Sequence, residues 1–89
     1  MISIDDSNTI KELTEKYSLT KVLLFGSAAR QDSGYRDIDL AVEGIRPQDF
    51  FRFYGELMSR LSVPVDLLDL SHPRRFSKMI SREGISLYG

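Results

Sequence analysis

Three aspartates are the residues of this chain whose type and spacing most clearly suit chemistry. Asp37 and Asp39 form an Asp-x-Asp pair, and Asp66 lies within the apolar run 63–70. If the first pair lies on a strand, both carboxylates point to one face while Ile38 and Leu40 face the core. Two carboxylates that close repel each other, and a divalent cation between them relieves the repulsion. The pattern predicts a cation site, and a solvated edge strand is the plainer alternative.

The pair Gly26-Ser27 directly follows the short apolar run 21–25, which reads as a buried strand. Glycine lets the backbone approach a phosphate closely, and the serine hydroxyl and nearby N–H groups can donate hydrogen bonds to it. An ordinary turn is the alternative, since both residues are common in turns. Asp66 would be costly to bury without a partner, but beside the Asp-x-Asp strand it would complete a cluster of three. Together these features are typical of two-metal phosphoryl-group chemistry.

The elements that must position these residues follow from the spacing of apolar residues. Helices are expected at about 7–17, from Pro47 onward and from Pro73 to Gly84, and strands at 21–25, 37–42 and 63–70, with a short terminal strand at 85–88. The short first link allows an antiparallel pair, and the long crossover from 42 to 63 allows a parallel one. We therefore predict one α/β domain over residues 1–89, a small mixed β-sheet with flanking helices.

Two helices carry more specific expectations. In the first, Thr9 and Glu12 fit a capping box. In the second, one face is expected to be apolar and buried, and Phe51 lies off that face and is expected to be exposed. The residues expected on the apolar face are Phe50, Phe53, Tyr54, Leu57, Met58 and Leu61.

The motifs resemble those of a known family. Segments 25–30 (FGSAAR) and 36–42 (RDIDLAV) are similar to the signature of the DNA polymerase beta nucleotidyltransferase superfamily, and segment 65–70 (VDLLDL) resembles its third-carboxylate strand. In its small size the chain resembles the minimal nucleotidyltransferase (MNT) group, the antitoxin half of HEPN–MNT toxin–antitoxin pairs. The chain departs from the family pattern at Gln31, at Arg36 and in a turn before Asp37 that is one residue short, all in the loop that would cradle a triphosphate.

The resemblance implies a polymerase beta-like fold and a metal-dependent reaction. Asp37 and Asp39 would hold Mg²⁺, and Asp66 would bind a second Mg²⁺ and help to deprotonate the attacking hydroxyl. The reaction would transfer AMP from ATP to a hydroxyl, in this setting a tyrosine of a HEPN toxin, so ATP and the toxin are the implied partners and a hetero-oligomer is the implied assembly.

The resemblance also assigns the nucleotide contacts. Gly26 and Ser27 would contact the β- and γ-phosphates, and Arg30 would bind phosphate unless it pairs with a surface acid such as Asp32. Two other functions stay open: a fold that neutralises the toxin by binding alone, and an antibiotic-modifying nucleotidyltransferase. The antibiotic-modifying function is disfavoured because such enzymes usually carry a second helical domain.

Composition limits the remaining functions. The 12 basic and 13 acidic side chains nearly cancel, which argues against direct nucleic-acid binding. With no cysteine and a single histidine, His72, thiolate zinc sites and histidine-rich metal sites are excluded. The chain shows no apolar run of about 20 residues for a membrane span and no signal-peptide pattern, which favours a cytoplasmic protein.

Overall fold

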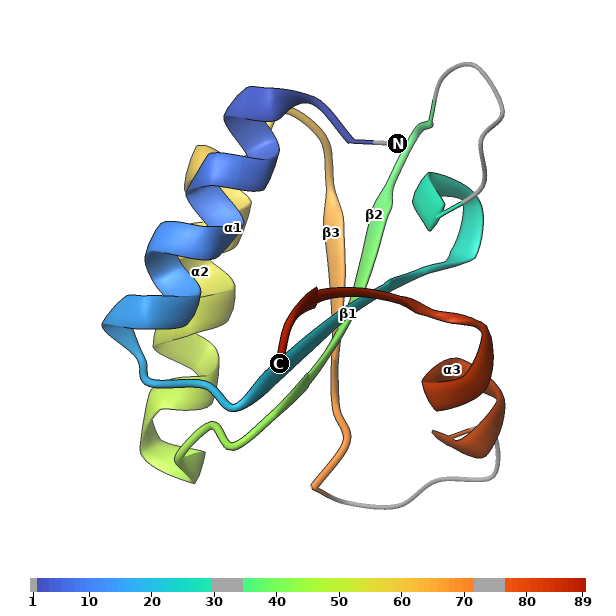
Figure 1. Ribbon diagram of the computed structural model, residues 1–89. Helices are drawn as coiled ribbons and strands as arrows, with labels where there is room; N and C mark the ends of the chain where they lie inside the picture. Colours follow the sequence, from blue (N-terminus) through green and yellow to red (C-terminus); the bar gives the residue numbers. More distant parts are fainter. Residues whose placement is uncertain (1, 30–34, 72–76) are drawn as a thin grey trace.

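A four-stranded sheet forms the centre of the molecule, and helices cover both of its faces (Figure 1). The computed structural model describes residues 2–29, 35–71 and 77–89. In chain order the elements are α1 (Ile4–Lys16), β1 (Lys21–Phe25), the 3₁₀ turn η1 (Gly26–Ala29), β2 (Ile38–Glu43), the 3₁₀ turn η2 (Pro47–Asp49), α2 (Phe50–Arg60), β3 (Val65–Asp69), α3 (Ser77–Glu83) and β4 (Ile85–Tyr88). The predicted α/β class with a small mixed sheet is confirmed.

The strands lie in the order β3–β2–β1–β4. β1 pairs antiparallel with β2 and with β4, and β2 pairs parallel with β3 across the connection that contains α2. Both predicted pairings are therefore confirmed, as is the terminal strand. A parallel neighbour places the beginnings of β2 and β3 at the same end of the sheet, which matters for the site described below.

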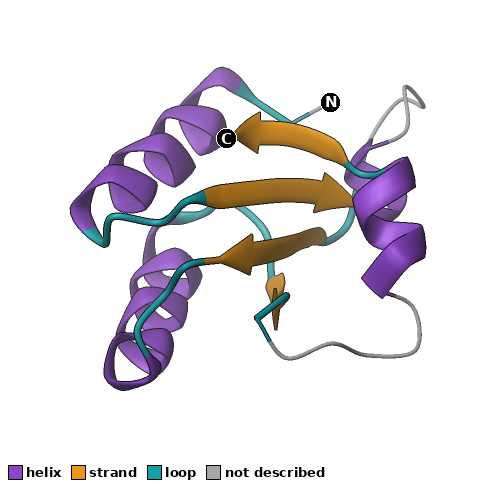
Figure 2. Ribbon diagram, turned by 60° about the horizontal axis from the view of Figure 1, so that its bottom comes forward, coloured by secondary structure: helices purple, strands orange, loops and turns teal. Residues whose placement is uncertain are grey.

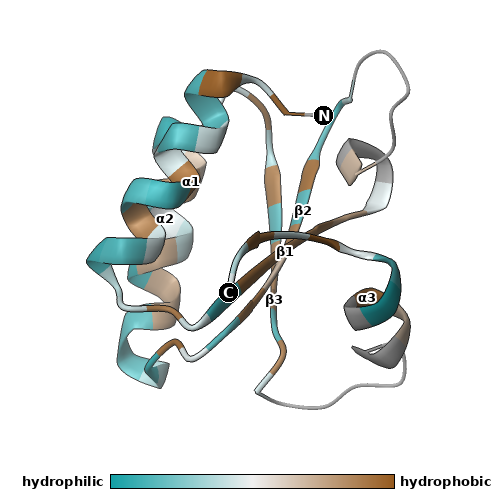
Figure 3. Ribbon diagram, viewed as in Figure 1, coloured by the Kyte–Doolittle hydropathy of each residue, from teal (hydrophilic) through white to brown (hydrophobic). Residues whose placement is uncertain are grey.

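The side-chain alternation of the strands divides the core into two layers. Val22, Leu24 and Leu40 belong to the larger layer, beneath α1 and α2, whereas Leu23 and Ala41 pack with Ile80 of α3 on the opposite face. Figure 2 shows α3 on the far side of the sheet from the helix pair, and Figure 3 shows apolar residues concentrated on the central strands. Since full burial of one such aliphatic side chain contributes about 1.5–3 kcal/mol, these two layers fix the strand register.

The first helix begins earlier than the sequence pattern suggested. Ser3 is the N-cap, and its hydroxyl accepts a hydrogen bond from the Asp6 N–H at 3.1 Å. The expected capping box is therefore wrong: Thr9 and Glu12 lie inside the helix, where no free N–H groups need capping. Two acidic residues in the first turn, one of them Asp6, also suit the positive end of the helix dipole.

The second helix differs from its predicted form in two details. Pro47 begins η2, and the α-helix itself starts only at Phe50. Phe53 and Leu57 are fully buried, but Met58 is 59% exposed, so its assignment to the buried face is wrong. The buried stripe is narrower than expected because α1 and the sheet cover only one side of the helix. Phe51 is 81% exposed, as predicted.

The end of the last helix agrees with its prediction. Gly84 follows α3, and its N–H donates to the Ile80 carbonyl at 2.8 Å. The expected start at Pro73 lies outside the described residues, as does His72. None of the described helices has both the length and the apolar character that crossing a membrane requires.

Candidate active site

Two of the three aspartates lie side by side on neighbouring strands. In the parallel pairing of β2 with β3, Asp39 is directly opposite Asp66. Ile38 and Leu40, on either side of Asp39, are fully buried, so the alternation predicted from the sequence is confirmed. Asp39 is half-buried and Asp66 is exposed. The apolar neighbours of Asp66 suggested that its carboxylate would be costly to bury. In the structure Asp39 is the more buried of the two, so most of this cost falls on Asp39.

Electrostatics at this pair favour the protonated form of one carboxyl group. Burial raises the pKa of Asp39 above its ordinary value of 3.8. The negative charge of Asp66, a hydrogen bond between the two carboxyl groups and the charge of Asp37 raise this pKa further. A carboxylate held near other carboxylates is favourable only when a proton or a cation neutralises part of the charge, so the site is suited to a cation.

The glycine turn lies directly against this pair. Gly26 has φ +72°, in the left-handed region that glycine adopts without steric cost. A Cβ atom at this position would lie 2.2 Å from Oδ2 of Asp39, so any side chain here would displace the Asp39 carboxyl group. Phe25, the last residue of β1, is the register partner of Asp39. The antiparallel pairing of β1 with β2 therefore brings the backbone of the predicted phosphate turn into contact with the predicted metal ligand.

The remaining predicted site residues are Asp37, Ser27 and Arg30, and the structure does not place them in the Asp39–Asp66 pair. Asp37 is exposed just before β2, and its charge is the weakest of the causes that act on Asp39. Ser27 belongs to η1, but its side chain lies outside the described part of the structure, and so does Arg30. Among the described residues, no group of three acidic or histidine side chains has the geometry of a metal site. The structure thus brings together Gly26, Asp39 and Asp66.

Phe25, at the end of β1, lines two pockets. The first contains Asp39 and Asp66 together with Leu67 and Leu68. The second lies beside the glycine turn and is lined by Gly26, Ala29, Met79, Ile80 and Glu83 in addition to Phe25. Sequence reasoning did not identify the contribution of α3, because the distance between residues 26 and 79 along the chain hides their proximity. Pro73 and Gly84 indicated only that a helix lies between them.

Comparison with protein families identifies the fold. The family described as polymerase beta, nucleotidyltransferase matches residues 8–89. The chain belongs to this family. In this nucleotidyltransferase, the matched region includes every element of the sheet and all three aspartates. A search of curated proteins found no match.

Several solved structures with the same fold are toxin–antitoxin complexes. One contains a tri-AMPylated Shewanella oneidensis HEPN toxin in complex with an MNT antitoxin: the matched chain is 28% identical, with a TM-score of 0.72 over 94% of this chain and 70% of that chain. A toxin–antitoxin structure with AMP-PNP gives 27% identity and a TM-score of 0.76 over 93% and 73% of the two chains. An MntA–HepT complex gives 26% identity and a TM-score of 0.70 over 94% and 70%. The nucleotidyltransferase is thus similar in sequence and fold to chains of such complexes.

Proposed function

We propose that this nucleotidyltransferase is an MNT antitoxin that transfers AMP from ATP to a tyrosine hydroxyl of a HEPN toxin, with Mg²⁺ as cofactor. The observation that carries the proposal is the contact between the Gly26 turn and the Asp39–Asp66 pair. This arrangement places a backbone suited to phosphate beside carboxylates suited to a cation. The similar complexes with an AMPylated HEPN toxin and with AMP-PNP support the choice of toxin and adenine nucleotide.

The donor atoms of the site fit Mg²⁺. Mg²⁺ prefers oxygen ligands and is commonly held by one or two carboxylates together with substrate phosphates. Asp39 and Asp66 supply such oxygens, and Asp37 is close enough to act on Asp39 electrostatically. These three residues would hold the metal. When bound, Mg²⁺ neutralises the carboxylates and polarises the phosphate oxygens.

The proposed reaction is an in-line substitution at the α-phosphorus of ATP. The tyrosine oxygen forms a bond to this phosphorus, the bond to the bridging oxygen of the β-phosphate breaks, and pyrophosphate leaves with that electron pair. The carboxylate of Asp66 accepts the hydroxyl proton, for which its exposure to solvent suits it. The backbone of the Gly26 turn orients the leaving pyrophosphate, and we assign phosphate contacts also to Ser27 and Arg30.

A second candidate function is neutralisation of the toxin by binding alone. It is favoured by the exposed apolar side chains of α2, Phe51 at 81% and Met58 at 59%. Exposed apolar surface of this kind often marks a protein interface. The two candidates differ in whether neutralisation depends on the carboxylates, and a single substitution separates them.

That substitution is Asp66→Asn, which removes the charge and keeps the volume. We expect AMP transfer to the HEPN partner to fall by about 10²–10⁴, the range for loss of a positioned general base or its metal. ATP–Mg²⁺ binding should stay within a few-fold because Asp37 and Asp39 remain. The measurements are mass spectrometry of the co-expressed toxin, for an added AMP on tyrosine, and calorimetry for ATP.

Asp69→Asn is the matched control, since Asp69 is on the same strand with the opposite side-chain parity. Its Oδ1 accepts a hydrogen bond from the Ser71 N–H at 2.9 Å, as expected of a strand-end residue. Transfer at the wild-type rate by Asp66→Asn would refute the catalytic assignment. Neutralisation without any AMP transfer, by the wild type and both variants, would establish the binding-only function.

A further inference from the structure

A buried carboxylate outside the proposed site has no role in the chemistry described so far. Asp6, in the first turn of α1, is only 3% exposed. Its Oδ1 accepts a hydrogen bond from the Ser62 N–H at 3.0 Å, and its Oδ2 accepts one from the Ser62 hydroxyl at 2.5 Å. The Tyr35 hydroxyl also donates to Oδ2, at 3.4 Å. Within the described part of the chain, no lysine or arginine forms an ion pair with Asp6.

Tyr35 connects this carboxylate to a second point of the N-terminal segment. Its hydroxyl accepts a hydrogen bond from the Ser3 N–H at 3.0 Å, and its ring packs against the larger core layer. The cluster of Asp6, Tyr35 and Ser62 therefore joins three separate segments: the start of α1, the segment before β2 and the segment before β3. Because a buried carboxylate without hydrogen bonds is costly, each donor is held in place by the need to satisfy it.

Two of these three segments lead directly to the aspartates of the active site. Tyr35 precedes Asp37 by two residues, and Ser62 precedes Asp66 by four. The two strands begin at the same end of the sheet, where the Ile38 N–H donates to the Pro64 carbonyl at 2.9 Å. Hence the Asp6 carboxylate, at the start of α1, connects the segment that leads to Asp37 and Asp39 with the segment that leads to Asp66.

We propose that the Asp6–Tyr35–Ser62 cluster is a positioning device that sets the placement of Asp37 and Asp39 relative to Asp66. Its importance for nucleotide transfer rests on the proposed function, whereas its effect on the two strands does not. Metal sites depend strongly on groups that orient the ligands, and loss of such a group typically weakens metal affinity or activity 10–100-fold. Asp37 needs such support most, because it precedes β2 and lacks the restraint of the strand pairing.

The test compares Tyr35→Phe with Tyr17→Phe. Both substitutions remove one hydroxyl that donates to a carboxylate, from Tyr35 to Asp6 and from Tyr17 to Glu56. Tyr17 caps the opposite end of α1, about 20 Å away along a helix of 13 residues. The measurements are the Mg²⁺ concentration that half-saturates ATP binding, by calorimetry, and amide hydrogen exchange at Ile38.

For Tyr35→Phe we expect the half-saturating Mg²⁺ concentration to rise about tenfold and exchange at Ile38 to accelerate, whereas Tyr17→Phe changes neither. Ser62→Ala, which removes the hydroxyl bond from the β3 side, should shift both in the same direction. The proposal requires both changes together. Equal behaviour of the Tyr35 and Tyr17 variants, or a change in only one of the two measurements, would overturn it. If the wild type shows no Mg²⁺-dependent ATP binding, the proposed function fails, and exchange at Ile38 alone then decides whether the cluster anchors the strands.

Discussion

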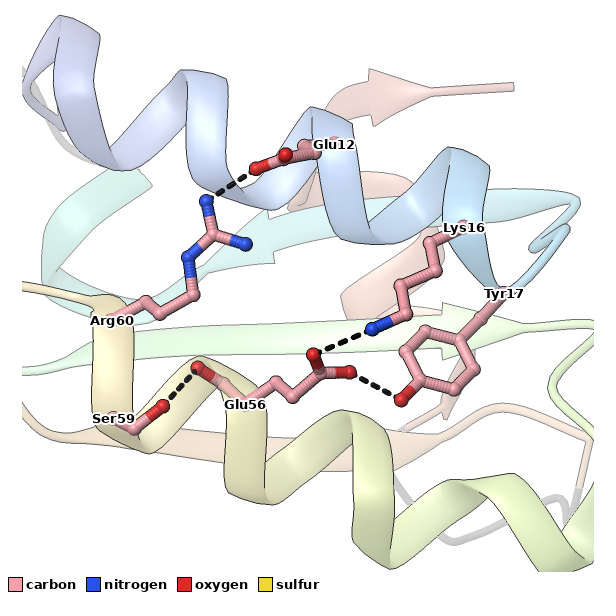
Figure 4. A network of polar contacts seen from close by, with 6 residues as sticks. All are labelled: Glu12, Lys16, Tyr17, Glu56, Ser59 and Arg60. Carbon is pink, nitrogen blue, oxygen red and sulfur yellow. Dashed lines mark hydrogen bonds and ion pairs between the residues drawn. The ribbon is translucent and has the colours of Figure 1, made fainter.

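Two carboxylates in this small domain have opposite electrostatic environments. Glu56 of α2 faces α1, where it accepts hydrogen bonds from Lys16 at 2.7 Å and from the Tyr17 hydroxyl (Figure 4). These hydrogen bonds and the positive charge of Lys16 lower the pKa of Glu56 below its ordinary value of 4.5. Asp39, by contrast, is partly buried and lies near the like charges of Asp66 and Asp37, and both effects raise its pKa. One carboxylate is stabilised as an ion by the fold, and the other is not.

The difference separates a structural region from a functional one. Between α1 and α2, Glu56 faces a lysine and a tyrosine hydroxyl, and Glu12 pairs with Arg60 (Figure 4). At the edge of β2 and β3, the carboxylates face one another. A fold that places like charges together loses stability unless a ligand supplies the opposite charge, which is why strongly perturbed groups in clefts are indicators of function.

Among the substitutions that compare these two regions, removal of the glycine in the turn should have the largest effect. In Gly26→Ala the new Cβ would need the space occupied by Oδ2 of Asp39, and φ +72° would strain any side chain. We expect AMP transfer to fall at least about 10²-fold, since a displacement of about 1 Å at a reacting group can cost that much. Gly55→Ala is the control, because no atom lies within 4 Å of its added Cβ.

Gly55→Ala should retain full activity and gain about 0.5–1 kcal/mol of stability, since alanine is favoured over glycine inside a helix. Transfer rates measured for both variants, with urea unfolding for stability, complete the test. An active Gly26→Ala protein would show that the contact with Asp39 is not needed for chemistry.

The opposite pKa shifts should give opposite dependences of stability on pH. The folded state holds the Asp39 proton more tightly than the unfolded state, so stability falls as pH rises from 3.8 through the raised pKa. The Glu56 contribution is instead complete above 4.5 and is lost as pH falls through the lowered pKa. At pH 7 without metal, Asp39→Asn should therefore be more stable than the wild type and Glu56→Gln less stable.

Urea unfolding of both variants at a series of pH values from 3 to 8 measures these differences, and each should shrink toward the acidic end of the range. Added Mg²⁺ should stabilise the wild type and leave Asp39→Asn largely unchanged, because binding to the folded state alone raises stability. A less stable Asp39→Asn protein at pH 7 would contradict the view of this edge as an uncompensated acidic site.

The smallest effect is expected where charges are paired but exposed. Arg60 and Glu12 form an ion pair with side chains 41% and 63% exposed. Arg60→Ala should cost only about 0.2–1 kcal/mol of unfolding free energy, and the loss should shrink in high salt. AMP transfer should be unchanged. A loss of activity in this variant would show that the helical layer and the site are coupled.

Much of the fold was predictable because the core leaves a clear pattern in the sequence. The alternation around Ile38 and Leu40 and the apolar run 21–25 indicated strands, and link lengths indicated their directions. The details that failed were local. The sequence did not distinguish Ser3, which caps α1, from later residues that are equally suited to cap a helix. The spacing of Met58 fits a buried helical stripe, but no neighbouring element covers its side of α2.

The candidate site was predictable in part for the same reason. Side-chain alternation placed Asp37 and Asp39 on one face, and the long crossover allowed the strand of Asp66 to lie beside them. The glycine turn was expected at the end of β1. The Asp6 cluster was not predictable, because its contacts join residues 29 and 56 positions apart and no periodic pattern links them. Polar contacts of this kind depend on the finished packing of helices on the sheet.

The parallel pairing of β2 with β3 has a consequence for how the protein becomes active during synthesis. α1, β1 and β2 come first in the chain, and β1 and β2 are near neighbours that can pair early. Asp39 meets Asp66 only after the crossover has been made and α2 has packed, a contact of the long-range kind that forms slowly. A nascent chain that stops short of β3 therefore carries the glycine turn and the Asp-x-Asp pair but no complete site. Catalytic competence is in this way tied to completion of the sheet.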